Sequence, residues 1–271
     1  MISDQFSRSM NVASQHDLSN FVIMKINKAL RNLRVRGRES CLAMPLTLYK
    51  IDASPPARAV MMVADILRVN YVAYDINPLM REQDTPEMTK KNPMRTVPYI
   101  EEDGFCLGDS HAIMLYLFDK YATAEHWHLY PTDKRKRATI NQRLFFDCGV
   151  LFQRLRSVMA PSYTGRLTEL SKSMKRNIDD AYRMLEAYLS DTLFLADEVV
   201  TLADLSAITT MSSLHGLHPI DEKRYPNVNR WYNNMSELEI CKRINAPGAE
   251  AHVASLKAFM AVTRSNLNSK L

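Results

Sequence analysis

The stretch Thr96–Leu117, TVPYIEEDGFCLGDSHAIMLYL, constrains the fold more than any other part of the sequence. Apolar residues after Val97-Pro98 lead to a polar turn at Glu101–Gly104, and a second apolar run at Phe105–Leu107 follows. The pair Asp109-Ser110 then opens an amphipathic segment. This pattern predicts a strand, a tight turn, a second strand and a helix. A helix N-terminus with a hydroxyl beside it suits a carboxylate, and the alternative interpretation of Asp109-Ser110 is an ordinary helix cap.

The residues before this stretch complete a small α/β unit. The order of elements is strand, helix, strand, short helix, strand, strand and helix, which predicts a thioredoxin-like fold. The four upstream elements are predicted at Leu46–Ile51, Ala57–Val69, Tyr71–Ile76 and from Pro86 to a stop at Asn92-Pro93. At the first strand-to-helix junction, a thioredoxin-like redox enzyme carries Cys-x-x-Cys, whereas this chain has Ser54-Pro55-Pro56-Ala57. Dithiol redox chemistry is therefore excluded at this junction.

Ser54 lies where the positive end of the following helix dipole points. A hydroxyl in that position can donate a hydrogen bond to the thiolate of a ligand and lower the pKa of its thiol. The alternative is that Ser54 only caps the helix.

Composition excludes several classes of protein. With 46% hydrophobic and 24% charged residues among 271, the chain is globular. Residues 1–43 hold seven Lys/Arg and three Asp/Glu, while the remainder holds 28 and 27, so the body is nearly neutral and no nucleic-acid surface is indicated. The four cysteines have no metal-ligand spacing and suit a reducing compartment, and no metal site is expected. No apolar run is long enough to span a bilayer.

Residues 1–43 are interpreted as an N-terminal extension. Within them, Ser19–Arg38 is basic and has an amphipathic pattern, as a mitochondrial presequence does. The favoured interpretation is instead a disordered or artefactual segment, since Met44-Pro45 is a plausible start just before the first strand. We therefore expect a cytoplasmic protein, with mitochondrial targeting as the alternative.

The predicted domains are 44–122 for the thioredoxin-like unit, 123–136 for a linker and helix start, and 137–271 for an all-helical domain. Thr201-Leu202-Ala203-Asp204 has the spacing of a helix capping box, so Asp204 is expected to stabilise the fold and not to act in catalysis. His126 and His128 flank Trp127, but without further ligands nearby they do not predict a metal site.

Three motifs in order resemble an insect cytosolic glutathione S-transferase, most closely the epsilon class, with the delta class next. These are Ser54–Ala59, Asn92-Pro93 followed by Thr96-Val97-Pro98, and Asp109–Ile113. The resemblance covers about residues 46–260. It implies that glutathione is the co-substrate, that no metal is needed and that the protein forms a homodimer.

The resemblance also implies roles for individual residues in the first domain. Ser54 would activate the glutathione sulfur, and Pro98 would be a cis proline that lets the Val97 backbone pair with the cysteinyl unit. Asp109 and Ser110 would hold the γ-glutamyl group.

Further roles follow for residues around these. His111, the next residue, would contribute to the same binding site or help to stabilise the dimer. Epsilon enzymes usually carry histidines where this chain has Gln83 and Arg95, facing the glycyl carboxylate, and an arginine can grip a carboxylate with two hydrogen bonds. Arg156 aligns with an arginine near glutathione or the pocket mouth, although an arginine on a helix is usually just solvated.

The resemblance also implies a hydrophobic pocket for the second substrate, supplied by the helical domain. The residues expected to line it are Pro56, Phe152, Leu155, Met159 and Phe259. The function predicted from the sequence is conjugation of glutathione to hydrophobic electrophiles, as in detoxification of insecticides or plant compounds. The alternatives are a weakly catalytic or non-catalytic carrier or steroid-binding protein with this fold and, third, an interaction module whose partner binds the basic N-terminus.

Overall fold

The structure, a computed structural model, describes residues 45–269. The expectations for residues 1–43, including the amphipathic segment Ser19–Arg38, lie outside the described residues. The chain divides into residues 1–36 and residues 37–271, and only the second of these units is described below.

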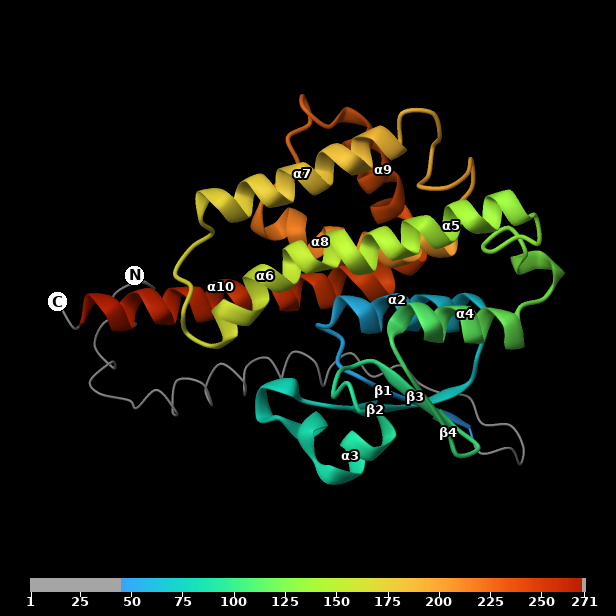
Figure 1. Ribbon diagram of the computed structural model, residues 1–271, viewed down its shortest axis with the longest axis horizontal. Coiled ribbons are helices and arrows are strands. Elements are labelled where there is room, and N and C mark those ends of the chain that lie inside the picture. The colour runs from blue at the N-terminus through green and yellow to red at the C-terminus, as the bar shows by residue number, and fades with distance from the viewer. Residues whose placement is uncertain (1–44, 270–271) are drawn as a thin grey trace. The chain divides into compact units, whose positions relative to one another are not determined.

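The first domain is a four-stranded mixed sheet with the strand order β2-β1-β3-β4 (Figure 1). Strand β1 pairs in parallel with β2 and antiparallel with β3, and β3 pairs antiparallel with β4. This is the predicted thioredoxin-like order. The elements are β1 (Leu46–Lys50), α2 (Pro55–Ile66), β2 (Tyr71–Asp75), α3 (Pro86–Lys91), β3 (Tyr99–Glu102), β4 (Phe105–Gly108) and α4 (Ser110–Tyr121).

Helix α2 begins two residues earlier than expected and ends three residues earlier. Its first residues are Pro55 and Pro56, which fit the first turn because the N–H groups there have no helical partner. Ser54 caps this turn. The early start places the Ser54 side chain directly at the helix mouth.

The second domain is helical throughout the described residues. Its elements are α5 (Lys134–Phe146), the π-helical turn η4 (Asp147–Leu151), α6 (Phe152–Tyr163), α7 (Lys172–Tyr188), α8 (Leu202–Leu217), α9 (Pro226–Glu237), the π-helical turn η5 (Cys241–Asn245) and α10 (Ala246–Asn268). No described helix is long and apolar enough to cross a bilayer.

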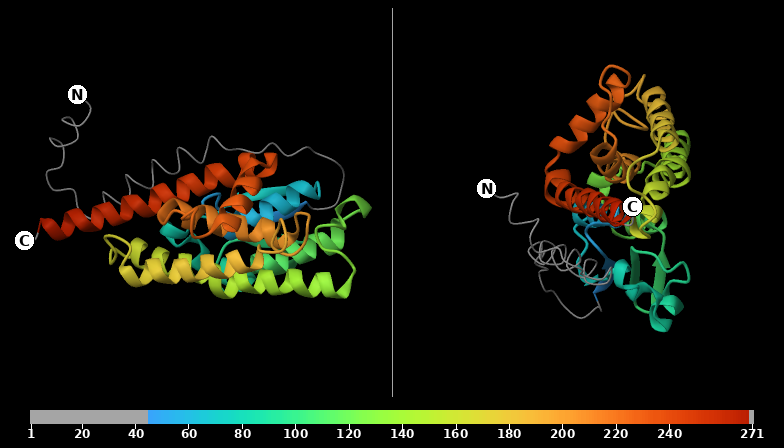
Figure 2. Two further views of the ribbon diagram at one scale, coloured as in Figure 1. Left: turned by 90° about the horizontal axis from the view of Figure 1, so that it is seen from above. Right: turned by 90° about the vertical axis from the view of Figure 1, so that its left-hand side faces the viewer.

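Helices α2 and α4 lie between the sheet and the helical domain, and α3 lies on the opposite side of the sheet (Figure 1). Helix α2 packs on α8, and the views in Figure 2 show α10 running beside both. One cluster of buried apolar side chains continues from Leu48 and Met62 in the first domain to Trp231 in the second. The shared core therefore fixes the first domain against the second.

The predicted capping box is present at the start of α8. One Asp204 carboxylate oxygen accepts hydrogen bonds from the Thr201 backbone N–H and from its hydroxyl, both at 2.9 Å. The other oxygen accepts from the Leu195 N–H and the Trp231 indole N–H. Asp204 is fully buried among these donors, so its role is structural, as expected.

Candidate functional site

Ser54 lies half-buried at the junction between β1 and α2. Its hydroxyl oxygen accepts a hydrogen bond from the Ala57 N–H at 3.5 Å, and the hydroxyl donates to the Val97 carbonyl, also at 3.5 Å. Both bonds are long. The hydroxyl can therefore donate its hydrogen bond to a closer acceptor without the loss of a strong internal hydrogen bond.

The peptide bond between Val97 and Pro98 is cis, as the resemblance implied. Pro98 is buried and Val97 is half-buried, immediately before β3. The Val97 carbonyl accepts a hydrogen bond from the Ser54 hydroxyl, so this backbone segment and the Ser54 side chain face each other.

The loop before Ser54 is held in place by a buried arginine. The Arg58 guanidinium is fully buried and donates to the Ala53 carbonyl at 2.8 Å. It also donates to the Thr209 carbonyl on α8 and to the Asn245 side chain, both at 2.9 Å. Burial lowers the pKa of Arg58 to about 9. The position of Ser54 thus depends on the helical domain, a link that the sequence motif gave no sign of.

Asp109 and Ser110 lie at the N-terminus of α4. Asp109 has a left-handed backbone, with φ of 69°, and its carboxylate accepts from the N–H groups of His111 and Ala112 at 2.9 and 3.2 Å. The imidazole of His111, 3.6 Å away, is the main cause of a low Asp109 pKa of about 2, with the Ala112 N–H contributing. The helix cap and the proposed binding role therefore involve the same carboxylate. Ser110 is largely buried.

His111 joins the two domains. Its Nε2 lies 3.2 Å from an oxygen of Asp147 on η4 and 3.0 Å from the Ser206 hydroxyl on α8. Burial alone would lower the His111 pKa, but its hydrogen bonds to Asp109 and Asp147 raise it to about 9. Sequence reasoning missed Asp147 and Ser206, because they lie 36 and 95 residues from His111 and no local pattern connects them.

The two residues that replace the expected histidines lie on either side of α3: Gln83 before it, and Arg95 between it and β3. The Arg95 side chain is 55% exposed, and its Nη1 lies 4.0 Å from a carboxylate oxygen of Asp84. Its backbone is left-handed, with φ of 53°. The Gln83 amide oxygen is buried and has no hydrogen-bond partner in the part of the chain that the structure describes.

The residues expected to line the hydrophobic pocket differ in exposure. Phe152 and Met159 are half-buried on α6, and Arg156 on the same helix is exposed. Pro56 is half-buried at the start of α2. Half-buried Phe259 packs edge-on against Tyr163, with ring centroids 5.3 Å apart.

Leu155 differs from the expectation. Its side chain is fully buried in the shared core, so it offers no surface to a ligand in this structure. Apolar residues on α6 include both buried ones, such as Leu155, and half-buried ones, such as Phe152 and Met159, and sequence spacing alone does not separate the two.

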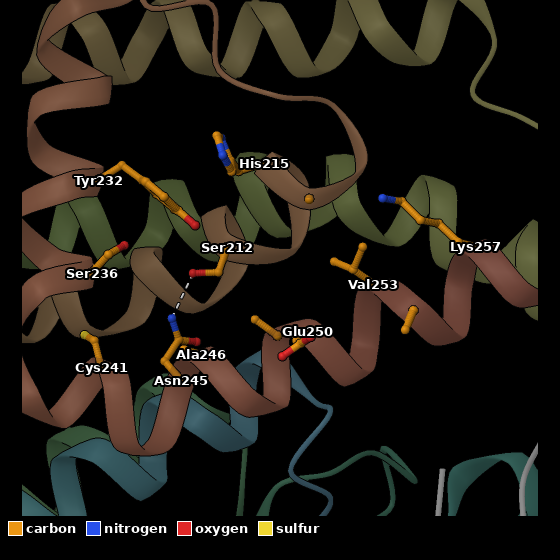
Figure 3. Close-up of a pocket in the computed structure, with 13 residues that line it drawn as sticks. Ser212, His215, Tyr232, Ser236, Cys241, Asn245, Ala246, Glu250, Val253 and Lys257 are labelled. Carbon is orange, nitrogen blue, oxygen red and sulfur yellow. Dashed lines mark hydrogen bonds between the residues drawn. The ribbon is translucent and has the colours of Figure 1, made fainter. Parts of the chain in front are cut away.

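A separate cavity of about 450 Å³ lies in the helical domain between α8, α9 and α10 (Figure 3). His215 and Tyr232 form part of its wall, with their rings stacked at 4.6 Å, and Ser212 accepts a hydrogen bond from Asn245 at its edge. None of the residues expected to bind glutathione or the second substrate lines it.

The fold and the site define a two-domain protein in which a serine replaces the redox cysteines of a thioredoxin-like unit, next to a helical domain. Residues 48–125 match the glutathione S-transferase N-terminal domain, and residues 155–239 match the glutathione S-transferase C-terminal domain. The chain is 42% identical to Glutathione S-transferase 1 of Manduca sexta over 207 residues, which span 76% of this chain and 94% of that protein. The chain therefore belongs to the glutathione S-transferase family.

Solved structures place it near insect enzymes of the epsilon class. An epsilon-class glutathione S-transferase from the housefly, Musca domestica, is 37% identical and superposes with a TM-score of 0.76, covering 79% of this chain and 98% of that one. A glutathione transferase homologue from Drosophila mojavensis, solved with bound glutathione, is also 37% identical, with a TM-score of 0.74 and coverage of 79% and 97%.

Proposed function

We propose that this protein conjugates reduced glutathione to small hydrophobic electrophiles. The observation that carries the proposal is the pairing of the Ser54 hydroxyl with the backbone of the cis Val97-Pro98 segment, at the mouth of α2. A peptide that adds to this backbone as a strand brings its cysteinyl sulfur towards Ser54. The glutathione-bound homologue from Drosophila mojavensis supports the choice of peptide.

The proposed mechanism relies on stabilising the thiolate. The Ser54 hydroxyl donates to the glutathione sulfur, and the α2 N-terminus adds a positive field, so the thiol loses its proton more readily. The proton leaves to solvent, and the thiolate attacks the electrophilic carbon held beside it. With a chloronitroaromatic substrate a C–S bond forms, the C–Cl bond breaks and chloride leaves to solvent. Positioning of the two reactants supplies much of the remaining rate enhancement.

The ends of glutathione are assigned to the charged residues at the site. Asp109, kept ionised by its low pKa, accepts from the γ-glutamyl ammonium, and Ser110 at the α4 N-terminus donates to the γ-glutamyl carboxylate. Arg95 and Gln83 take the glycyl carboxylate. At the γ-glutamyl end, the interaction of His111 with Asp147 keeps the start of α4 in position.

The second substrate is assigned to the apolar side chains around α6. Phe152, Met159, Phe259 and Pro56 are partly exposed and can contact a ligand, and a methionine adapts to ligands of varied shape. Arg156, exposed on the same helix, is assigned to the mouth of this pocket. Detoxification of foreign compounds such as insecticides or plant products, in the cytoplasm, is the proposed biological role.

Ser54→Ala tests the mechanism. We expect kcat/KM for a chloronitroaromatic substrate to fall by about 10²-fold or more, as for other lost donors to a developing anion, with retention on immobilised glutathione kept. Ser54→Thr keeps a hydroxyl and is the matched control, expected to recover part of the rate. A Ser54→Ala enzyme with wild-type kcat/KM would show that the hydroxyl does not activate the thiol.

A second candidate is a carrier with little or no catalysis. Two observations favour it: the Gln83 amide oxygen has no hydrogen-bond partner among the described residues, and the Arg95 guanidinium lies 4.0 Å from a carboxylate oxygen of Asp84. A folded wild-type protein that neither binds immobilised glutathione nor turns over the chloronitroaromatic would support the carrier over the transferase.

A further inference from the structure

Three potential metal ligands from two elements, one in each domain, lie close together. Asp109 and His111 lie at the start of α4, and Cys148 lies on η4. One carboxylate oxygen, one imidazole nitrogen and the thiol sulfur all lie within 4.8 Å of one another. π-helical turns such as η4 occur often at functional sites.

The imidazole of His111 is oriented as a metal ligand would be. Its Nε2 faces Asp147 and Ser206, while its Nδ1 faces Asp109 at 3.6 Å. A hydrogen bond from Nε2–H to Asp147 leaves the lone pair of Nδ1 directed at the cluster in the neutral ring. Histidines that bind metals usually donate their second ring N–H to a carboxylate in this way.

Asp147 supplies a second observation. Its side chain is 4% exposed, one oxygen accepts a hydrogen bond from Ser206, and the other oxygen is buried with no hydrogen-bond partner among residues 45–269. A buried polar atom without a partner calls for an explanation such as a nearby ion, so this oxygen agrees with a cation close to His111.

We propose that Asp109, His111 and Cys148 bind a thiophilic divalent cation, Zn²⁺ or Cd²⁺, with Asp147 as the positioning residue for His111. A thiolate, an imidazole and a carboxylate are a ligand set that such ions accept, with a fourth position for water. Bond lengths of about 2.0–2.3 Å require ligand atoms about 3.5 Å apart, so the side chains must close by roughly 1 Å. Binding displaces the protons of the Cys148 thiol and of Nδ1 to solvent.

The cation would compete with glutathione. This consequence, unlike the metal site itself, rests on the proposed function, in which Asp109 holds the γ-glutamyl ammonium. A metal bound to the same carboxylate would remove that acceptor and block the γ-glutamyl end.

The test is titration of the reduced, metal-free full chain with Cd²⁺. A thiolate–cadmium charge-transfer absorption reports binding independently of activity. We expect one Cd²⁺ per chain, no band in Cys148→Ser, and an unchanged band in the matched control Cys106→Ser, which replaces a half-buried free cysteine on β4. Cys41→Ser is the control for the cysteine outside the described residues.

The remaining variants separate a built site from a lone thiol. Asp147→Asn should keep the band and weaken affinity by about 10- to 100-fold, as loss of a carboxylate partner does at other metal histidines. His111→Gln should weaken it further. A band that persists in Cys148→Ser, or affinity unchanged in both Asp147→Asn and His111→Gln, would overturn the proposal.

Displacement by S-methylglutathione, which has no free thiol, tests the competition. Release of Cd²⁺ by this compound supports a shared Asp109. Retention of Cd²⁺, with the band still lost in Cys148→Ser, would uphold the metal site and count against the proposed glutathione geometry.

Discussion

Replacing Asp204 by alanine is expected to destabilise the protein more than any exposed cap would. Asp204 is fully buried and accepts four hydrogen bonds, from the Thr201 N–H and hydroxyl, the Leu195 N–H and the Trp231 indole, at 2.8–2.9 Å. Alanine leaves these donors in the interior without an acceptor.

The expected loss of stability follows from the number of donors that Asp204→Ala leaves without an acceptor. Each buried donor without a partner costs about 1–3 kcal/mol, and the costs do not add fully when one relaxation serves several donors. We therefore expect a loss of about 3–5 kcal/mol in the free energy of unfolding, comparable to breaking a buried charged network. Asp133 is the matched control, because it caps α5 with two hydrogen bonds but is exposed, so Asp133→Ala should cost about 1 kcal/mol.

The assay is urea unfolding at 25 °C, followed by circular dichroism. Asp204→Asn keeps the size of the side chain and one carbonyl oxygen, so it should lie between wild type and Asp204→Ala and supplies a measurable variant if the alanine protein does not fold. Equal losses for Asp204→Ala and Asp133→Ala would refute the argument that buried donors set the cost.

Two further predictions concern acid stability and assembly. Burial and the nearby charge of Arg58 lower the pKa of His252 from 6.5 to about 3, so the folded state holds it neutral and its stabilising contribution is lost as pH falls from 6.5 towards 3. Between pH 7 and 5, wild type should lose about 2 kcal/mol more unfolding free energy than His252→Asn, as measured by denaturant titration. The control is His128→Asn, which replaces an exposed histidine and should behave as wild type. Equal losses for wild type and His252→Asn would contradict this prediction. We propose that Phe145 on α5, which is 75% exposed, lies in a homodimer interface. Wild type should then sediment as a dimer and Phe145→Glu as a monomer, and a dimer in both would place the interface elsewhere.

Much of the first domain followed from the sequence because its determinants are local. Ser54 before two prolines, Asp109 before an amphipathic segment and Thr201 three residues before Asp204 each act on backbone groups within one helical turn. The alternation of strands and helices then leaves few ways to build the sheet. Leu155 was expected to line the pocket but lies in the core, because α6 carries apolar residues for both the core and the surface.

The sequence alone thus determined the order of elements, the serine at the redox position and the capped helix mouths, because these depend on near neighbours. Only the tertiary structure decided that Arg58 holds the Ser54 loop through Thr209 and Asn245, and that His111 meets Asp147, Ser206 and Cys148. These residues come from distant parts of the chain, and their spacing carries no periodic signal. Contacts of that kind are set by how the two domains share one core.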